Sequence, residues 1–338
     1  MSRIPYIFCP LCQFFEECGD AAWGRRRPMF QCYRDDRNMD LDLQRRHLER
    51  VAAVEGVELP ADYASRVLDL VHSARGRVAR PLEFSVALDQ GEEHWCRFSV
   101  VYWDRAQESQ RRDLQHALAT ARLFGALEEG GIQEIIQDAI EEGPTLQLLY
   151  GVDLRRVGTR QKIYVRLGHG EAAWKEAMIR RLVPAFHRDL APLPLDILRL
   201  VGIDLRAGGQ SCPGIKLYFM PGQISWERGV ALAGHHPFLE FVKGRCADLR
   251  ELIMIQRLAA DAPVERRIDE VDLHLLRNLL DLKDLWTFLE SQGSPFDLRR
   301  FLGMYRAALV VPTSVTFQAQ AMEKMNLYYL MVGPRRGS

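Results

Sequence analysis

Two related segments in the middle of the chain constrain its fold more than any other feature. The first, at 150–168, reads YGVDLRRVGTRQKIYVRLG, and the second, at 201–222, reads VGIDLRAGGQSCPGIKLYFMPG. Each contains G-[VI]-D-L-R, then a short linker with Gly, and then a run in which Lys and Tyr alternate with apolar residues. The copies lie about fifty residues apart, a spacing typical of a repeated supersecondary unit.

The polar residues of each run share one face of a predicted strand. Because residues two apart in a strand point to the same side, Lys162, Tyr164 and Arg166 face one way and the apolar residues between them face the other. Lys216 and Tyr218 repeat this arrangement in the second copy. A solvated sheet surface explains one such strand as well as a ligand site does, but two matched copies favour a functional face.

Two further segments carry cations or tyrosines on strand-like runs: HWCRFSVVYWD at 94–104 and MEKMNLYYLMV at 322–332. Helical segments lie between the strands and have apolar faces that could cover the apolar side of a sheet. This pattern predicts an α+β protein with a barrel whose interior carries Lys, Arg and Tyr. Such an interior suits an anionic ligand.

The predicted helices and strands alternate along most of the chain. Amphipathic helical patterns occur within 39–78, 105–124, 131–142, 171–186, 269–290 and 296–306, whereas 246–259 is compatible with either a strand or a helix. PLEFSVALD, beginning at Pro81, and the run at 94–104 form a predicted hairpin, and RAALVVPTSVTFQAQA and KMNLYYLMV form the last pair of strands.

Composition limits the function classes. The chain has 338 residues, and its 45 Lys and Arg balance its 45 Asp and Glu, which argues against a nucleic-acid binder that relies on net positive charge. No uncharged run is long enough to span a membrane, and the start has no signal-peptide pattern. We expect a cytoplasmic monomer with one barrel domain at 39–332 and a disordered tail at 333–338.

Residues 1–38 form a predicted N-terminal extension that contains Cys9, Cys12, Cys18 and Cys32. The C-x-x-C pair can supply two thiolates to a tetrahedral zinc ion, and the other two cysteines could complete the site. The alternative is a set of reduced cysteines in an irregular segment. The odd total of seven cysteines does not indicate a disulfide framework.

A single carboxylate stands out on the first predicted strand. Glu83 lies among apolar neighbours in PLEFSVALD, and Arg97 lies on the partner strand of the hairpin. If this face is solvated, Glu83 is an ordinary surface residue. If it lines the barrel, Glu83 becomes a candidate general base in a partly desolvated site.

The order of these motifs resembles the cyanobactin-type peptide prenyltransferases, which have the ABBA barrel fold. L-E-x-S at 82–85 precedes the strand with Arg97, and the two repeats and a terminal N-L-Y-Y follow, so that the resemblance covers about residues 80 to 332. It implies an antiparallel barrel of ten strands surrounded by helices, whose interior binds an isoprenoid diphosphate. The segment at 1–38 has no counterpart in the family, and 223–275 aligns only loosely.

The resemblance also implies roles for individual residues. Glu83 corresponds to the general base of the family. The residues expected to hold the diphosphate are Arg97, Lys162, Tyr164, Lys216, Tyr218, Arg257, Tyr328, Tyr329 and Arg166. Fixed cations would stabilise the departing diphosphate, and the tyrosines could donate hydrogen bonds or stabilise an allyl cation through their ring faces. Mg²⁺ is expected to enter with the diphosphate, whose oxygens would hold most of it.

The expected function is transfer of a dimethylallyl or geranyl group to a ribosomally made peptide, linear or cyclic. In this family the peptide acceptor helps to exclude water from the open barrel. One alternative keeps the barrel but changes the acceptor to a small aromatic molecule, an indole or a phenol. A second is a catalytically inactive barrel that binds peptides, and a third is an α+β protein with no ligand.

Overall fold

The structure is a computed structural model of the chain. It describes residues 41–73, 82–89, 92–101, 106–123, 131–143, 145–154, 159–168, 170–183, 190, 193–205, 214–222, 224–245, 249, 252–258, 268–275, 280, 282–293, 310–318 and 324–331. The cysteine-containing segment at 1–38, the tail at 333–338 and the predicted helix at 296–306 lie outside the described residues. The predictions made for them therefore stay predictions.

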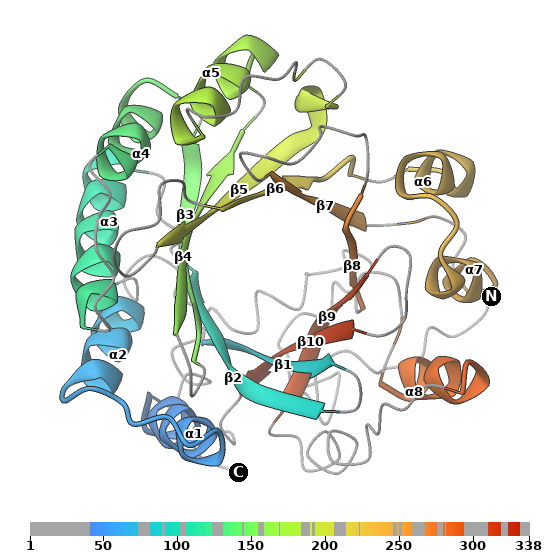
Figure 1. Cartoon of the computed structure of the whole chain (residues 1–338), viewed down its shortest axis with the longest axis horizontal. Helices are drawn as coiled ribbons and strands as arrows, with labels where there is room; N and C mark the ends of the chain where they lie inside the picture. The colour runs from blue at the N-terminus through green and yellow to red at the C-terminus, as the bar shows by residue number, and fades with distance from the viewer. Residues whose placement is uncertain are drawn as a thin grey trace, which may run out of the picture.

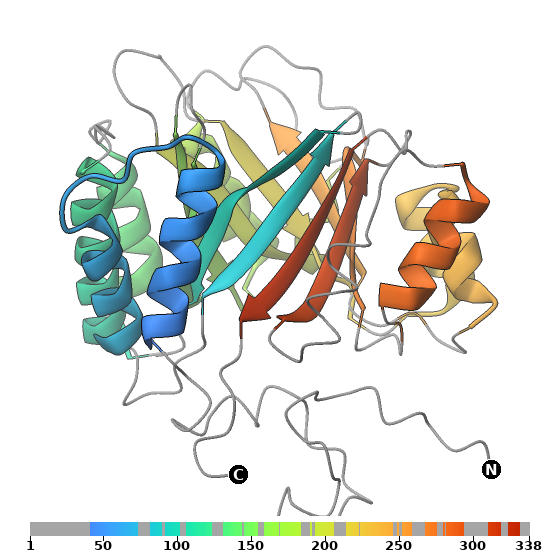
Figure 2. The ribbon, with the colours of Figure 1, turned by 90° about the horizontal axis from the view of Figure 1, so that it is seen from below.

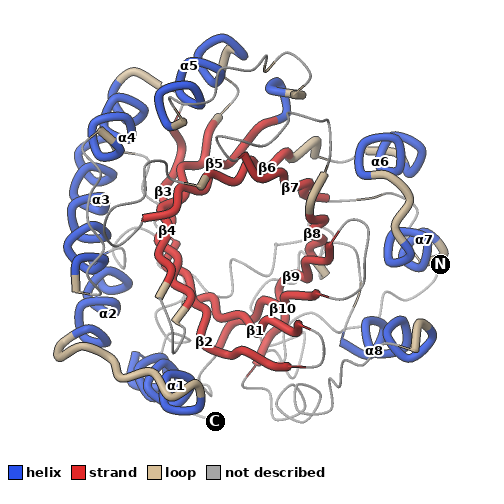
Figure 3. Tube along the Cα trace, viewed as in Figure 1, coloured by secondary structure: helices blue, strands red, loops and turns tan. Residues whose placement is uncertain are grey.

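Ten strands form a closed antiparallel barrel at the centre of the molecule (Figure 1, Figure 3). They are β1 (Glu83–Asp89), β2 (Glu92–Val101), β3 (Thr145–Asp153), β4 (Arg160–Leu167), β5 (Leu198–Leu205), β6 (Ile215–Phe219), β7 (Leu252–Leu258), β8 (Glu270–His274), β9 (Val310–Gln318) and β10 (Lys324–Met331). Strands that follow one another in the chain pair side by side, and β10 pairs with β1 to close the ring. A closed ring leaves no sheet edge.

Helices surround the barrel on its outside. They are α1 (Leu41–Val54), α2 (Tyr63–Ser73), α3 (Gln107–Arg122), α4 (Ile132–Glu141), α5 (Ala172–Leu182), α6 (Trp226–Ala233), α7 (Pro237–Lys243) and α8 (Leu282–Ser291), with a short 3₁₀ helix at Leu195–Ile197. Seen from the side, the strands run obliquely, with α1 to α4 along one flank and α6 to α8 along the other (Figure 2). The α+β barrel expected from the sequence is confirmed.

The core lies between the outer face of the barrel and the helices. In β4, for example, Ile163, Val165 and Leu167 are fully buried, whereas the side chains between them are partly exposed. This period of two follows from strand geometry: one face packs against helices and the other faces the barrel interior. Burying the apolar face is the main source of stability of such a layer, at about 25 cal/mol per Å².

A buried glutamine ties the first strand of the ring to the last. Gln44 of α1 is fully buried, and its Oε1 accepts a hydrogen bond of 3.1 Å from the backbone N–H of Leu82, which immediately precedes β1. Its Nε2 donates a hydrogen bond of 2.8 Å to the backbone carbonyl of Met331, the last residue of β10. The side chain of Gln44 thus fastens α1 across the β1/β10 seam.

The structure refines several local predictions. Each sequence repeat is a β-hairpin, β3–β4 or β5–β6, because the G-[VI]-D part belongs to a strand of its own. The ambiguous segment at 246–259 contains strand β7. The helix predicted over 269–290 is wrong in its first part, where Glu270–His274 forms β8, whereas Leu282–Ser291 is helical. In the part of the chain that is described, no helix is both long and apolar enough to cross a membrane.

Candidate functional site

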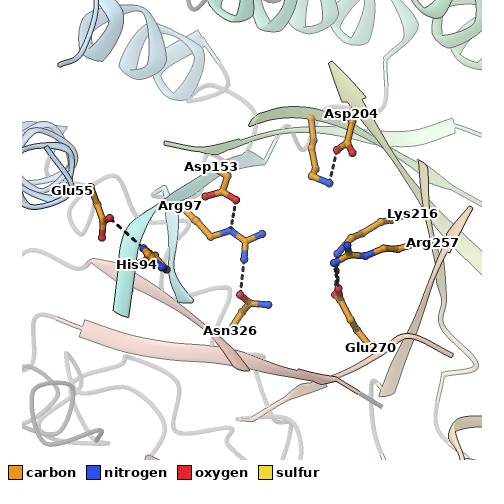
Figure 4. Close-up of polar contacts among 10 residues, drawn as sticks. Glu55, His94, Arg97, Asp153, Asp204, Lys216, Arg257, Glu270 and Asn326 are labelled. Atoms are coloured by element: carbon orange, nitrogen blue, oxygen red, sulfur yellow. Dashed lines mark hydrogen bonds and ion pairs between the residues drawn. The ribbon is translucent and has the colours of Figure 1, made fainter. Parts of the chain in front are cut away.

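Strand register determines which side chains share the interior of the barrel. Arg97 lies opposite Asp153, Lys162 opposite Asp204 and Lys216 opposite Arg257, in consecutive strand pairs. Figure 4 shows Arg97, Asp153, Asp204, Lys216, Arg257, Glu270 and Asn326 inside the ring, whereas the Glu55–His94 contact lies outside it. The predicted cations therefore do converge on one enclosed space.

The first cationic group is centred on Arg97. Its Nη1 donates a 2.6 Å hydrogen bond to Oδ1 of Asn326 on β10, and its Nε lies 3.7 Å from Oδ2 of Asp153 on β3 (Figure 4). Burial alone would lower the pKa of Arg97, but Asp153 and nearby tyrosines outweigh it and hold this pKa above its ordinary value. Arg97 is thus a permanent positive charge in a fixed orientation.

The second group pairs Lys162 with Asp204 on the neighbouring strand, where Nζ lies 2.5 Å from Oδ1. Burial lowers the pKa of Lys162, Asp204 raises it, and the charges of Arg97 and Arg257 lower it further, so the net shift is downward. The interior therefore crowds several cations together. A multiply charged anion would relieve that repulsion.

The third group joins three strands through one carboxylate. Glu270 of β8 accepts hydrogen bonds of 2.8 and 2.9 Å from Nζ of Lys216 on β6, and one of 2.6 Å from Nη2 of Arg257 on β7 (Figure 4). Burial opposes the charge on Glu270, but the two cations hold its pKa low, at about 2. Burial, Arg257 and Lys162 lower the pKa of Lys216, and Glu270 only partly offsets this.

Sequence reasoning found these cations but missed their carboxylate partners. Asp153 and Asp204 are the aspartates of the two G-[VI]-D motifs, and each pairs with a cation on the preceding strand. The signal was present, because the aspartate recurs in both copies of the repeat. The prediction from sequence assigns the motif to no strand, because Gly and Asp are uncommon in strands.

The glycines of the same motifs make room for Tyr164. A Cβ atom added to Gly151 would lie 2.8 Å from Cε2 of the Tyr164 ring, and one added to Gly202 would lie 2.9 Å from Cδ1 and Cε1. Any larger residue at either position would therefore displace the ring. The ring also meets Tyr218 edge to face, with 5.9 Å between centroids. The repeat thus encodes a seat for an aromatic side chain in the barrel interior.

The tyrosines of the barrel interior remain protonated. Burial raises the pKa of Tyr164 to about 12 and also raises the pKa values of Tyr218 and Tyr328. Their hydroxyls are consequently hydrogen-bond donors at neutral pH. Their rings add polarisable faces next to the cations.

The prediction of Tyr329 as a diphosphate-binding residue is wrong. Tyr328 and Tyr329 are adjacent in β10, so they point to opposite sides, and Tyr329 is fully buried against α1. Its hydroxyl lies 2.9 Å from Nε2 of His47, and its ring stacks on Phe84. Tyr329 is a core residue between the barrel and α1.

Arg166 lies on the predicted interior face, two residues beyond Tyr164. Its Nη1 donates a 3.1 Å hydrogen bond to Oε1 of Gln147 on β3. Arg166 lies beyond both Lys162 and Tyr164 in β4, and it bonds to a glutamine, whereas Lys162 pairs with Asp204. Its expected role in binding diphosphate stays a prediction.

Glu83 also lies on the interior face, opposite Ser99 in β2. Its Oε1 accepts a 2.9 Å hydrogen bond from Oγ1 of Thr313, and its Oε2 accepts one of 3.4 Å from Oγ of Ser99. Thr313 sits at a bulge of β9, where the register with β10 shifts, and this brings its hydroxyl to Glu83. Two neutral hydroxyls thus hold the carboxylate of Glu83 in place.

The acidic residues of the described strands do not assemble into a metal site. Among the described residues, no group of three or more His, Cys, Asp or Glu is arranged to hold a metal ion. Asp153, Asp204 and Glu270 already face cations.

Comparison with known proteins identifies the fold. A scan against protein-family models finds no match, and neither does a sequence search of curated proteins. Solved structures do match. The 5-dimethylallyltryptophan synthase from Streptomyces coelicolor superposes with a TM-score of 0.59 at 17% identity, over 86% of this chain and 96% of that one. The fold is that of the ABBA prenyltransferases.

Two other solved ABBA structures match a similar share of this chain. The 6-dimethylallyltryptophan synthase from Micromonospora olivasterospora, in complex with DMASPP and Trp, has a TM-score of 0.60 at 16% identity and covers 87% of this chain and 97% of that one. NotF in complex with brevianamide F and DMSPP has a TM-score of 0.55 at 11% identity, with 86% and 95% covered. At these identities the likeness establishes the ABBA barrel.

Proposed function

We propose that this protein is a prenyltransferase that moves a dimethylallyl group from its diphosphate to a small aromatic acceptor. The observation that carries the proposal is the barrel interior, where Arg97, Lys162, Lys216 and Arg257 lie together with Tyr164, Tyr218 and Tyr328. This combination suits an anion that becomes more negative as its allyl group departs. Solved structures of the same fold, described as complexes with a thiolodiphosphate analogue and Trp or brevianamide F, support this assignment.

The cations perform the first part of the reaction. Breaking the allylic C–O bond sends the electron pair to the diphosphate, and the positive charges of Arg97, Lys162 and Lys216 stabilise the negative charge that develops there. These side chains are oriented before the ligand arrives by Asp153, Asp204 and Glu270. Oriented charges in a buried site lose little energy to reorganisation during the reaction.

The tyrosines protect the allyl cation. The ring of Tyr164 lies over Gly151 of β3 and Gly202 of β5, and it meets the ring of Tyr218. Both rings lie next to the cationic groups. Attraction between a cation and a ring is worth about 2 kcal/mol or more when water is excluded. The tyrosine side chains also exclude water, which would otherwise react with the allyl cation before the acceptor does.

Glu83 completes the reaction as the proposed base. The acceptor supplies the electron pair for its new bond to the allyl carbon and must then lose a proton. Glu83 is held by Thr313 and Ser99 on the interior face and can take that proton. The products are the prenylated acceptor and diphosphate. We further propose that Mg²⁺ enters with the diphosphate. The roles proposed for the protein's own residues do not depend on it.

A peptide acceptor, which the sequence resemblance favours, is the second candidate. The small aromatic acceptor has better support, because the similar solved structures are described with tryptophan and with brevianamide F. A geranyl donor and an inactive barrel are the remaining alternatives. Each is distinguished by the product that the protein makes.

The test is mass spectrometry of reactions with dimethylallyl or geranyl diphosphate, with and without Mg²⁺. Tryptophan, tyrosine, and linear and cyclic peptides serve as acceptors. We expect a mass increase of one C5 unit on the indole amino acid. Product on peptides alone would favour the second candidate, and no product with any acceptor would contradict prenyl transfer.

Donor binding is tested separately by calorimetry with dimethylallyl thiolodiphosphate. Lys162→Ala and Lys216→Ala should each weaken binding, because each removes a cation from the proposed clamp. Lys243→Ala on α7 is the matched control and should bind the analogue like the unmodified protein. Unchanged affinity in both interior variants would contradict the placement of the diphosphate.

A further inference from the structure

A second carboxyl group in the barrel interior has no role in the chemistry described so far. Asp272 of β8 lies opposite Thr316 of β9 and Ile253 of β7, and only 7% of it is exposed. Oγ1 of Thr316 donates to its Oδ2 at 2.5 Å, and Oγ of Ser314 donates to the same atom at 3.3 Å. Within the described strands and helices, no hydrogen bond or ion pair reaches Oδ1.

The partners of Asp272 differ from those of the other interior acids. Asp153, Asp204 and Glu270 each lie within 4 Å of a Lys or Arg side chain. Asp272 is held by neutral hydroxyls instead, as Glu83 is. The interior thus has a cationic part, with its own carboxylates, and a part in which the described carboxyl groups have no counterion.

Both of these carboxyl groups depend on the same stretch of β9. Thr313 bonds to Glu83, while Ser314 and Thr316 bond to Asp272. The β9 bulge at this point allows the adjacent residues 313 and 314 to serve two carboxyl groups that come from β1 and β8. An acceptor positioned for proton transfer to Glu83 would consequently lie near Asp272.

The electrostatic environment of Asp272 indicates which kind of ligand would stabilise its carboxylate. Burial, together with the charges of Glu83 and Glu270, raises the pKa of Asp272, and the hydrogen bonds from Thr316 and Ser314 only partly oppose this, so that its pKa is about 7. A carboxylate held this way is stabilised by any positive charge that a ligand brings. A neutral ligand brings none.

We propose that Asp272 binds a cationic nitrogen of the acceptor, an ammonium or guanidinium group, while Glu83 receives the proton from the reacting atom. The proposal rests on the proposed prenyl transfer and specifies its acceptor class: an aromatic molecule that also carries a positive charge. The diphosphate takes the cationic part of the interior and the charged acceptor takes the acidic part. Asp272 then determines specificity without taking part in bond formation.

The test compares tryptamine with 3-propylindole, in which a methyl group replaces the amine. In the unmodified protein we expect kcat/KM to be at least about tenfold higher for tryptamine, the size expected for a charge-assisted hydrogen bond. Asp272→Asn should reduce this preference to near unity. An indole with a guanidinoethyl group in place of the aminoethyl group distinguishes the two kinds of cation.

Two further variants show whether a lost preference for tryptamine comes from Asp272 itself or from a disturbed fold. Thr316→Val keeps the carboxyl group of Asp272 but removes the hydroxyl that orients it, so the preference for tryptamine should fall without disappearing. Asp284→Asn on α8, which alters the exposed ion pair of Asp284 with Arg245, should keep the full preference. Thermal unfolding of each variant reports whether the barrel is intact.

The inference and the proposed function fail in different ways. Prenylation of both indoles with equal efficiency, in the unmodified protein and in Asp272→Asn alike, would overturn the inference and leave prenyl transfer standing. If neither indole is prenylated, calorimetry with the thiolodiphosphate analogue bound measures their affinities directly. Equal affinities, or no binding of either, would again overturn it.

Discussion

At the scale of single residues, the barrel interior is built from opposed charges rather than from cations alone. Arg97, Lys162 and Lys216 each face a carboxylate. Glu83 is distinguished from those carboxylates because hydroxyls hold it. A carboxylate that is already paired with a cation has its partner, whereas the hydroxyls that hold Glu83 bring no charge to it.

This difference predicts the behaviour of Glu83→Gln. The amide keeps the size and can still bond to Thr313, but it cannot take a proton, so turnover should fall by about 100-fold or more. Binding of dimethylallyl thiolodiphosphate should change little. Steady-state kinetics and calorimetry measure the two effects, and Glu134→Gln on α4 is the control. Unchanged turnover would show that Glu83 is not the base.

A second prediction concerns the seat of Tyr164. In Gly202→Ala the new methyl group would approach the ring to 2.9 Å, and relieving that contact should cost about 1–3 kcal/mol of unfolding free energy. In a Tyr164→Ala background the same substitution should cost much less, because the Tyr164 ring is absent and only the Tyr218 ring, 3.3 Å from the added Cβ, remains close. Urea unfolding of the four proteins gives the coupling. Gly244→Ala, at an uncrowded site, is the control, and additive effects would contradict the proposed contact.

At the scale of helices and strands, periodicity allowed much of the molecule to be predicted. Helices α1 to α5 and strands β1, β2, β4, β6, β9 and β10 all correspond to patterns read from the sequence. Strands β3, β5 and β8 were harder to predict. They carry Gly or acidic residues at interior positions, and such residues are uncommon in strands. β8, with Glu270 and Asp272 on a five-residue strand, resembles a helical run when read alone.

The same limit applies to the site. Alternation identified Lys162, Tyr164, Lys216 and Tyr218 because each is flanked by apolar residues that mark the opposite face. It could not choose between Tyr328 and Tyr329, since both are tyrosines in one strand. Asp272 gave no signal, because its importance depends on hydroxyls from β9 that are distant in sequence. Long-range partners of this kind cannot be obtained from local pattern.

The docking of α1 predicts a pH effect on stability. His47 packs edge to face on Phe84, and burial, aided by Arg50, lowers its pKa from 6.5 to about 4. The unfolded chain therefore binds a proton near pH 6.5 that the folded protein accepts only near pH 4. This contribution to stability is complete above pH 6.5 and is lost as pH falls toward 4, by at most about 3 kcal/mol.

Urea unfolding at pH 7.5 and pH 5 measures this effect. His47→Gln should lose less stability between the two pH values than the unmodified protein, because glutamine does not titrate. His235→Gln, at an exposed position before α7, should keep the original dependence. The same pH dependence in all three proteins would rule out His47 as its source.

At the scale of the whole molecule, stability depends on ring closure. Every strand of the barrel has two neighbours, and β1 and β10 meet only after the chain has travelled around the ring. The buried side chain of Gln44 spans this seam through Leu82 and Met331. Loss of that clamp should weaken the entire barrel and not α1 alone.

Gln44→Met tests the clamp with a side chain of similar length. It leaves two buried backbone groups without partners, and each should cost about 1–3 kcal/mol of unfolding free energy. Circular dichroism and tryptophan fluorescence should report the loss as one shared transition. Gln107→Met, which removes an exposed hydrogen bond to the carbonyl of Glu141, is the control and should change stability far less. Separate transitions for helix and barrel would contradict a global role.

The seam also bears on how the protein is made. During synthesis β1 leaves the ribosome early, but its partner β10, residues 324–331, emerges only after every other strand of the ring. Until then β1 has an unpaired edge, and α1 lacks the Met331 carbonyl that fastens it. The nascent chain must therefore carry an open sheet edge through most of its translation, a state that favours aggregation and engagement by chaperones.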